Sequence, residues 1–328
     1  MTVQVKQESF PLAQVFTISR GSRTETRVLT AEISAEGFTG RGECVPYPRY
    51  GESVESVTRQ IERMAAELTH PDPAINRAAL AERMPAGAAR NALDCALWDL
   101  EAKRSNRAVW EIAGLNRPKP VVTAYTISLD EPHKMRSEAA KHAHRPLLKI
   151  KLGGWNDVER LEAVRAGATT SDIIVDANEG WTAAVYRELC PTLQRLGVKM
   201  VEQPLPADHD QYLNELPRPV PICADESCHT RAGLSELIGR YDYINIKLDK
   251  TGGLTEALAL RNEAQQAGFR IMVGSMVGSS LGMAPAVIAA QDAVFVDLDG
   301  PLWLAEDRPH GLRYDTAGVH PPTAELWG

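Results

Sequence analysis

The chain has 328 residues, of which 44% are apolar and 24% are charged, a composition typical of a globular protein with one large domain or two ordinary ones. Its net charge of −7 provides no basic surface for nucleic acid or anionic lipid, and no apolar run is long enough to cross a membrane. Because the five cysteines are scattered and the first residues contain no continuous apolar segment, we expect a cytoplasmic protein that binds neither nucleic acid nor membrane.

The N-terminal third predicts strands followed by helices. Residues 1–40 alternate apolar and polar side chains, and Glu36-Gly37 is a hairpin signal. The stretch CVPYPRYGES, residues 44–53, is rich in Pro, Gly and Tyr and predicts an ordered surface loop. From residue 53 to 114 apolar side chains recur at helical spacing, so we expect helices there.

The rest of the chain alternates short apolar runs with helical segments. Eight runs are typical of buried strands, at residues 121–128, 147–153, 172–179, 198–204, 221–227, 243–249, 270–276 and 293–300. Strands that alternate with helices predict a parallel sheet, and eight of them predict a closed β/α barrel. An open doubly wound sheet is the alternative, but no GxGxxG sequence follows any of these strands.

Polar side chains lie at the C-terminal end of nearly every predicted strand. They are Lys149, Lys151, Asp176, Asn178, Glu202, Asp225, Glu226, Lys247, Asp249, Ser275, Asp297 and Asp299. In a β/α barrel these strand ends converge on the active site. Residues far apart in the sequence are therefore expected to meet in one pocket.

Three of these residues are acids on successive strands, Asp176, Glu202 and Asp225. Carboxylates that converge in a buried pocket repel one another unless a cation holds them, and oxygen ligands suit Mg²⁺. The alternative is that each acid caps the next helix or pairs with a surface base. The matching positions of all three favour a metal site.

Lysines flank the three acids on both sides in the strand order. Lys149 and Lys151 share one face of the strand before the acids, and Lys247 lies on the strand after them. Isolated lysines are usually salt-bridged or extend their ammonium group to solvent. A lysine can act as a base only if its pKa falls from about 10.4 toward neutrality. A neighbouring ammonium, a metal ion and burial all lower it.

Several stretches together resemble the enolase superfamily, muconate-lactonizing subgroup. They are KIK (149–151), VDANEGW (175–181), VEQP (201–204), ADES (224–227) and INIKLD (244–249). GECVPYPRYGES, AGAARNALDCALWDL, PICADESCHT, NIKLDKTGGLTEALAL and DLDGP are similar to the dipeptide epimerases of that subgroup. The resemblance implies an α/β fold in which a modified (β/α)7β barrel of the TIM type, residues 119–300, follows an N-terminal α+β capping domain. The cap would span residues 1–118, completed by residues 301–328.

The resemblance also implies a role for each residue at the strand ends. One Mg²⁺ per subunit, held by Asp176, Glu202 and Asp225, would bind the substrate carboxylate and stabilise an enediolate. Lys151 would serve the D-configured carbon and Lys247 the L-configured carbon in a 1,1-proton transfer. The residues expected to support these groups are Lys149, Asn178 and Glu226.

The expected substrate is a dipeptide with an acidic side chain. Asp297 and Asp299 suit its ammonium group, Arg20 or Arg23 suits its side-chain carboxylate, and Ser275 also lies at the predicted substrate site. Without the resemblance, the alternative is that the two aspartates are turn or helix-capping residues. The loop GECVPYPRYGES, residues 42–53, is expected to cover the site through Tyr47, Arg49 and Tyr50.

The expected function is therefore that of an isomerase which interconverts L-Ala-D-Glu and L-Ala-L-Glu in murein peptide recycling. Other outcomes of the same half-reaction stay open: a dipeptide epimerase of different specificity, a cycloisomerase, o-succinylbenzoate synthase or an acid-sugar dehydratase. A non-catalytic binding barrel is a further alternative, although the full set of acids and lysines argues against it. The expected partners are a small dipeptide and, in a homo-oligomer, further copies of the chain.

Overall fold

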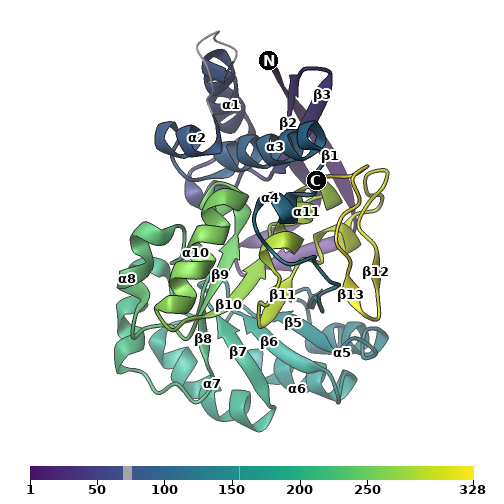
Figure 1. The fold of residues 1–328 in the computed structure, drawn as a ribbon. Helices are drawn as coiled ribbons and strands as arrows, with labels where there is room; N and C mark the ends of the chain where they lie inside the picture. Colours follow the sequence, from purple (N-terminus) through teal and green to yellow (C-terminus); the bar gives the residue numbers. More distant parts are fainter. Residues whose placement is uncertain (69–75, 155) are drawn as a thin grey trace.

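The computed structural model describes residues 1–68, 76–154 and 156–328. An antiparallel sheet with helices beside it lies against one end of an eight-stranded parallel barrel (Figure 1). The sheet consists of β1 (Thr2–Ile18), β2 (Gly21–Ala35) and β3 (Phe38–Cys44). Its helices are η1 (Pro48–Tyr50, a 3₁₀ turn), α1 (Val54–Leu68), α2 (Arg77–Arg83), α3 (Ala88–Ser105) and α4 (Val109–Ile112).

The capping sheet forms as its sequence predicts. The turn between β2 and β3 is at Glu36 and Gly37, both with positive φ, as a two-residue hairpin requires. Helix α3 packs so closely on β3 that a Cβ at Gly40 or Gly42 would lie 2.1 Å from a carbonyl oxygen of α3. The helices predicted between residues 53 and 114 are confirmed, except that residues 69–75 lie outside the described residues.

All eight predicted strands of the barrel are present, and each is shorter than its apolar run. They are β4 (Tyr125–Ile127), β5 (Leu147–Lys151), β6 (Asp172–Asp176), β7 (Val198–Glu202), β8 (Ile222–Ala224), β9 (Tyr243–Lys247), β10 (Arg270–Gly274) and β11 (Phe295–Asp297). They pair in parallel in chain order. Several polar residues of the runs, among them Asn178, Asp225 and Asp249, lie just beyond the ends of the strands.

Helices cover the outside of the barrel between successive strands (Figure 1). They are α5 (Pro132–Lys141), α6 (Asp157–Gly167), α7 (Ala183–Arg195), α8 (Leu234–Leu237), α9 (Leu248–Thr251), α10 (Leu254–Gln266) and α11 (Ser280–Ala289), with 3₁₀ segments η2 (Ala207–Glu215), η3 (Arg231–Gly233) and η4 (Gly300–Trp303). A short hairpin, β12 (Tyr314–Asp315) and β13 (Gly318–Val319), follows. Between the outer strands β4 and β11, Ala124 N donates to Val296 O at 2.8 Å, so the barrel is nearly closed.

The barrel interior is layered. The layer far from the cap is apolar and consists of Ala124, Leu147, Ile174, Met200, Cys223, Tyr243 and Met272. Because side chains alternate along a strand, the residues two positions further on also point inward. These next positions carry Lys149, Asp176, Glu202, Asp225 and Asn245. The apolar layer thus closes the bottom of the barrel beneath a charged layer.

The C-terminal residues return to the cap. Trp327 Nε1 donates to Cys95 O on α3 at 3.0 Å, and Arg41 donates to Leu326 O at 2.6 Å. These contacts support the division into cap and barrel, whose boundaries at residues 118 and 300 stay a proposal. Among the described residues, each helix is too short or too polar to span a membrane.

Candidate active site

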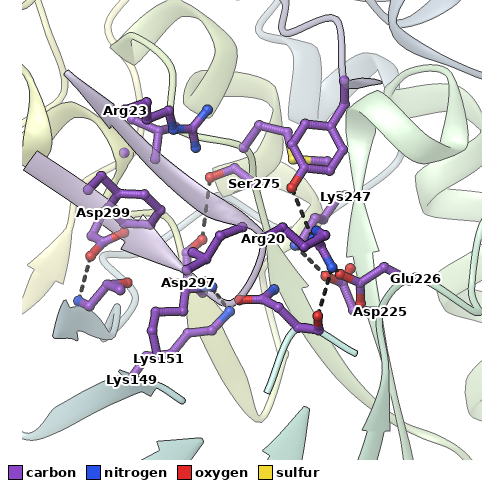
Figure 2. A pocket seen from close by; sticks show the side chains of 18 of the residues that line it. Arg20, Arg23, Lys149, Lys151, Asp225, Glu226, Lys247, Ser275, Asp297 and Asp299 are labelled. Carbon is purple, nitrogen blue, oxygen red and sulfur yellow. Dashed lines mark hydrogen bonds and ion pairs between the residues drawn. The ribbon is translucent and has the colours of Figure 1, made fainter. Parts of the chain in front are cut away.

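A pocket lies between the cap and the C-terminal ends of the barrel strands (Figure 2). Most of the site residues predicted from the sequence line it: Arg20, Arg23, Lys149, Lys151, Asn178, Asp225, Glu226, Lys247, Ser275, Asp297 and Asp299. Asp176 and Glu202 lie beneath this lining and are wholly buried. The structure thus brings together most of the residues that the strand-end pattern singled out, but not Asp249, which does not line the pocket and is hydrogen-bonded to Asn91 and Val45 of the cap.

Lys149 is a buried ammonium group shared by three acids. Its Nζ lies 3.0 Å from Asp176 Oδ2, 2.7 Å from Glu202 Oε2 and 2.7 Å from Asp297 Oδ2. Burial alone would lower the pKa of Lys149, but the three carboxylates raise it well above its usual value. Lys149 is therefore firmly protonated in this arrangement.

The two proposed bases lie on opposite sides of the pocket (Figure 2). Lys151 Nζ is 2.6 Å from Asp176 Oδ2, and Lys247 Nζ is 2.6 Å from Asp225 Oδ2. Burial opposes the charge on Lys247, yet Asp225 and Glu202 raise its pKa. Both lysines are positioned to reach one molecule from two faces.

The three acids have the chemistry of a site for a hard divalent cation. In this arrangement, however, ammonium groups lie between the carboxylates, and no three acidic, cysteine or histidine side chains of the described residues surround one point closely enough to hold a metal. Glu202 Oε2 is ion-paired with Lys149 Nζ at 2.7 Å but accepts no hydrogen bond from the described residues, so a metal ion would compete with Lys149 for this oxygen. We take Asp176, Glu202 and Asp225 to fit Mg²⁺ by donor type, burial and strand position.

Sequence reasoning missed three residues that hold the acids. Asn245 Nδ2 donates to Glu202 Oε1 at 2.8 Å, and Lys250 Nζ lies 2.6 Å from Asp225 Oδ1. Gln203 Oε1 accepts from Asp225 N at 2.9 Å. The two-residue period of β9 could have identified Asn245, which shares the inward face with Lys247. Lys250 and Gln203 follow the ends of their strands, and no periodic signal reaches them.

Asn178 and Glu226 sit beside the acids, as predicted for supporting groups. Asn178 N donates to Asp176 Oδ1 at 2.9 Å, which fixes that carboxylate. Burial, together with Asp225 and Asp176, raises the pKa of Glu226 to about 6. Asn178 Oδ1 and Glu226 Oε2 are buried and have no hydrogen-bond partner among the described residues.

The two candidate arginines are not equivalent. Arg20 Nη2 lies 2.8 Å from Glu226 Oε1, and its Nη1 donates to Asn178 O at 2.9 Å. Arg23 has no carboxylate partner within the described ranges and lies 5.2 Å from the centre of the Phe16 ring. Burial lowers the pKa of the Arg23 guanidinium. Arg23 is therefore the arginine of the pair that is free to take an anion.

Asp297 and Asp299 also line the pocket. Asp297 Oδ2 is held by Lys149, while Asp297 Oδ1 is buried with no hydrogen-bond partner among the described atoms. Asp299 Oδ2 accepts from Thr126 N at 2.7 Å, and burial followed by the charge of Asp297 raises the pKa of Asp299 to about 6. Ser275 Oγ donates a long hydrogen bond, 3.4 Å, to Asp297 O.

The predicted covering loop is ordered and lies against the pocket. Tyr47 and Tyr50 line it. Arg49 does not line it and instead forms a double contact with Glu179 on the β6–α7 loop, at 2.6 and 2.7 Å. The loop is thereby fastened across the pocket from the cap to the barrel.

The fold and the pocket define an α/β-barrel enzyme with a capping domain. Two family models match the chain: "Mandelate racemase / muconate lactonizing enzyme, N-terminal domain" at residues 1–114 and "Enolase C-terminal domain-like" at residues 134–324. The chain belongs to the enolase superfamily.

Two relatives show which members of that family the sequence is similar to. The L-Ala-D/L-Glu epimerase of Escherichia coli (strain K12) is 47% identical over 97% of this chain and 99% of its own length. The N-acetyl-D-glutamate racemase of a Pseudoalteromonas species is 44% identical over 92% of this chain and 95% of its own length. As these names indicate, the protein is an isomerase of the racemase and epimerase type.

Two solved structures show the same fold with ligands. An enolase family member from Agrobacterium tumefaciens with homology to dipeptide epimerases contains sodium and L-Ala-L-Glu; it is 53% identical, covers 99% of both chains and gives a TM-score of 0.96. The dipeptide epimerase of Cytophaga hutchinsonii, complexed with Mg and D-Ala-L-Val, is 29% identical over 99% of this chain and 94% of its own, with a TM-score of 0.92.

Proposed function

We propose that the protein interconverts L-Ala-D-Glu and L-Ala-L-Glu, and that it does so in the cytoplasm as a step of murein peptide recycling. One observation carries the substrate assignment. Among the described residues, the pocket offers a buried carboxylate oxygen without a hydrogen-bond partner, Asp297 Oδ1, and a partly buried guanidinium without a carboxylate partner, Arg23. An L-Ala-Glu dipeptide supplies an ammonium group for the first and a side-chain carboxylate for the second.

The chemistry would take place at the Glu α-carbon between the two lysines. From the D-epimer, Lys151 Nζ takes the α-proton, and the electron pair of the broken C–H bond moves into the adjacent carboxylate. Lys247 then gives a proton to the opposite face, and the L-epimer results. The reverse direction exchanges the two roles. The positions of Lys151 and Lys247 on opposite sides of the pocket support this scheme.

Asp176, Glu202 and Asp225 would hold one Mg²⁺ beside this carbon. When bound, Mg²⁺ supplies a Lewis acid for the substrate carboxylate, where negative charge develops. Carboxylates that held such a cation would no longer pair with Lys151 and Lys247, and the two ammonium groups would then be free to face the substrate. Arg49 and its contact with Glu179 would help the covering loop to exclude water.

The same site disfavours substrates that lack an ammonium group. N-acetyl-D-glutamate, or the substrate of a cycloisomerase, o-succinylbenzoate synthase or acid-sugar dehydratase, would leave Asp297 Oδ1 buried and unpaired. Leaving such an oxygen unpaired costs about 1–3 kcal/mol, and more for a charged group. An N-acetyl-D-glutamate racemase is nonetheless the second candidate, because a relative that is 44% identical carries that name.

A proton-exchange experiment separates these candidates. The protein is incubated with Mg²⁺ in D₂O, in parallel with L-Ala-D-Glu and with N-acetyl-D-glutamate, and the Glu α-proton is followed by NMR. We expect the α-proton signal of L-Ala-D-Glu to disappear while L-Ala-L-Glu forms. The kcat/KM for L-Ala-D-Glu should be well above that for N-acetyl-D-glutamate. Faster exchange of N-acetyl-D-glutamate, or no exchange of any L-Ala dipeptide, would contradict the proposal.

A further inference from the structure

Helix α3 of the cap holds the segment that follows the proposed base Lys247. Arg90 Nη2 donates to Thr251 O at 2.6 Å, and Arg90 Nε donates to Gly252 O at 3.2 Å. One turn further along α3, Asp94 Oδ2 accepts from Thr255 N at 3.0 Å. Figure 1 shows α3 lying across the barrel end next to α10. These bonds connect a cap helix to the backbone just beyond β9.

The contact nearest to Lys247 is a buried hydrogen bond between two side chains. Asn91 Nδ2 on α3 donates to Asp249 Oδ1 at 2.8 Å, and Val45 N, also from the cap, donates to the same oxygen at 3.1 Å. Asn91 is 2% exposed and Asp249 9% exposed. Asp249 lies two residues after Lys247, so both cap groups act on the carboxyl end of the strand that carries the base.

Two glycines show how closely the segment after Lys247 packs against α3. Gly252 and Gly253 have φ angles of +78° and +113°, which side chains rarely adopt. A Cβ at Gly252 would lie 2.4 Å from Arg90 Nε, and one at Gly253 would lie 2.4 Å from Asp94 Oδ2. The segment therefore lies directly on α3 and cannot shift toward it.

The opposite base is held in a different way. The segment after Lys151 is fixed within the barrel by Asp157, whose Oδ2 accepts from Gly154 N at 2.7 Å and from Trp181 Nε1 at 2.8 Å. Asp157 is 1% exposed and lies at the start of α6. The segments that follow the two lysines are thus held by different parts of the protein, the one after Lys247 by the cap and the one after Lys151 by the barrel.

We infer that Asn91 and Asp249 are positioning residues for Lys247, so that the cap controls proton transfer at one face of the substrate only. This inference rests on the proposed two-base function. If Lys247 is displaced, Lys151 still removes the α-proton of the D-epimer and can return a deuteron to the same face. The D-epimer then exchanges without inverting, while the L-epimer neither exchanges nor inverts.

The variant Asn91→Asp tests this directly, because it places a second carboxylate against Asp249 in a buried site. In D₂O with L-Ala-D-Glu, the ratio of exchange to inversion should rise at least tenfold. The double variant Asn91→Asp/Asp249→Asn restores a donor and an acceptor in swapped order and should return the ratio toward that of the parent. The matched variant Asp157→Asn should show the mirror effect, with exchange without inversion from the L-epimer.

Two results would overturn the inference. One is an equal fall of exchange and inversion from both epimers in Asn91→Asp, since general damage lowers both. The other comes from amide hydrogen exchange of the substrate-free protein by mass spectrometry. In that measurement, Asn91→Asp should speed amide exchange in residues 248–253 and leave it unchanged in residues 147–153. Unchanged amide exchange in residues 248–253 would refute the coupling between Asn91 and the segment after Lys247, even if the parent protein has no activity. A parent that exchanges neither epimer refutes the proposed function itself.

Discussion

Replacement of Lys149 by methionine should destabilise the metal-free protein strongly. Three buried carboxylates lie within 3.0 Å of its Nζ, and removing one partner of a buried ion pair typically costs about 3–5 kcal/mol. The unfolding entropy near the midpoint is about 2.1 cal/mol/K per residue. For 328 residues this amounts to roughly 0.7 kcal/mol/K, so the Tm should fall by about 4–7 °C.

The assay is thermal unfolding followed by circular dichroism, in EDTA and in saturating Mg²⁺. A ligand at 100 times its Kd stabilises the folded state by about 2.7 kcal/mol. Mg²⁺ should raise the Tm of Lys149→Met more than that of the parent, because the variant lacks the ammonium group that competes with Mg²⁺ for the carboxylate oxygens. The difference in Tm between the two proteins should therefore be smaller in Mg²⁺ than in EDTA. Lys199→Met, at an exposed lysine on β7, should barely change Tm. Two results would refute this reasoning: a Tm of Lys149→Met in EDTA equal to that of the parent, or a Tm difference that is as large in Mg²⁺ as in EDTA.

Three further predictions concern specificity, packing and pH. Arg23→Leu should raise the KM for L-Ala-D-Glu roughly 10- to 150-fold, because a hydrogen bond to a charged group contributes about 1.5–3 kcal/mol. The control is Arg27→Leu, at an exposed arginine of β2. An equal rise of KM in that variant would argue against a specific contact of Arg23 with the substrate. Gly253→Ala should lower the free energy of unfolding, measured in urea, by about 2 kcal/mol or more, because Gly253 has a φ of +113° and a Cβ there would clash with Asp94. Gly197→Ala, at a glycine with open space around it, should lower the same free energy by only about 1 kcal/mol. Equal decreases in the two variants would contradict this packing. Burial raises the pKa of Asp94 from 3.8 to about 6, so the folded state holds this proton more tightly and the free energy of unfolding should fall as pH rises from about 4 to about 6, by up to about 3 kcal/mol. Asp94→Asn lacks this titration, so its stability in urea relative to the parent should rise over that range, and a constant difference would refute the assignment.

The sequence predicted the barrel and the charged layer because both follow from short-range patterns. The two-residue period of β5 places Lys149 and Lys151 on one face, and the recurrence of one strand and one helix places Asp176 and Asp225 at the same level. These features need only local alternation and the convergence of strand ends in a barrel.

The contacts between cap and barrel could not be predicted in this way. Asn91 and Asp249 are separated by 158 positions. Asn91 looks like an ordinary polar residue of its helix, and the strand-end pattern placed Asp249 at the pocket and not against the cap. Likewise, Arg20 and Arg23 are indistinguishable in the loop sequence, and only the position of Glu226 in space shows that Arg20 is already paired. Such pairings depend on how two domains pack, which local patterns do not encode.

The most direct test of the two-base mechanism uses Lys151→Ala and Lys247→Ala with each epimer of L-Ala-Glu in D₂O and Mg²⁺. By NMR of the Glu α-proton, Lys151→Ala should lose exchange from L-Ala-D-Glu and keep it from L-Ala-L-Glu. Lys247→Ala should show the reverse, and neither variant should epimerise. If either variant still interconverts the epimers, the two lysines do not act as the acid and base on opposite faces.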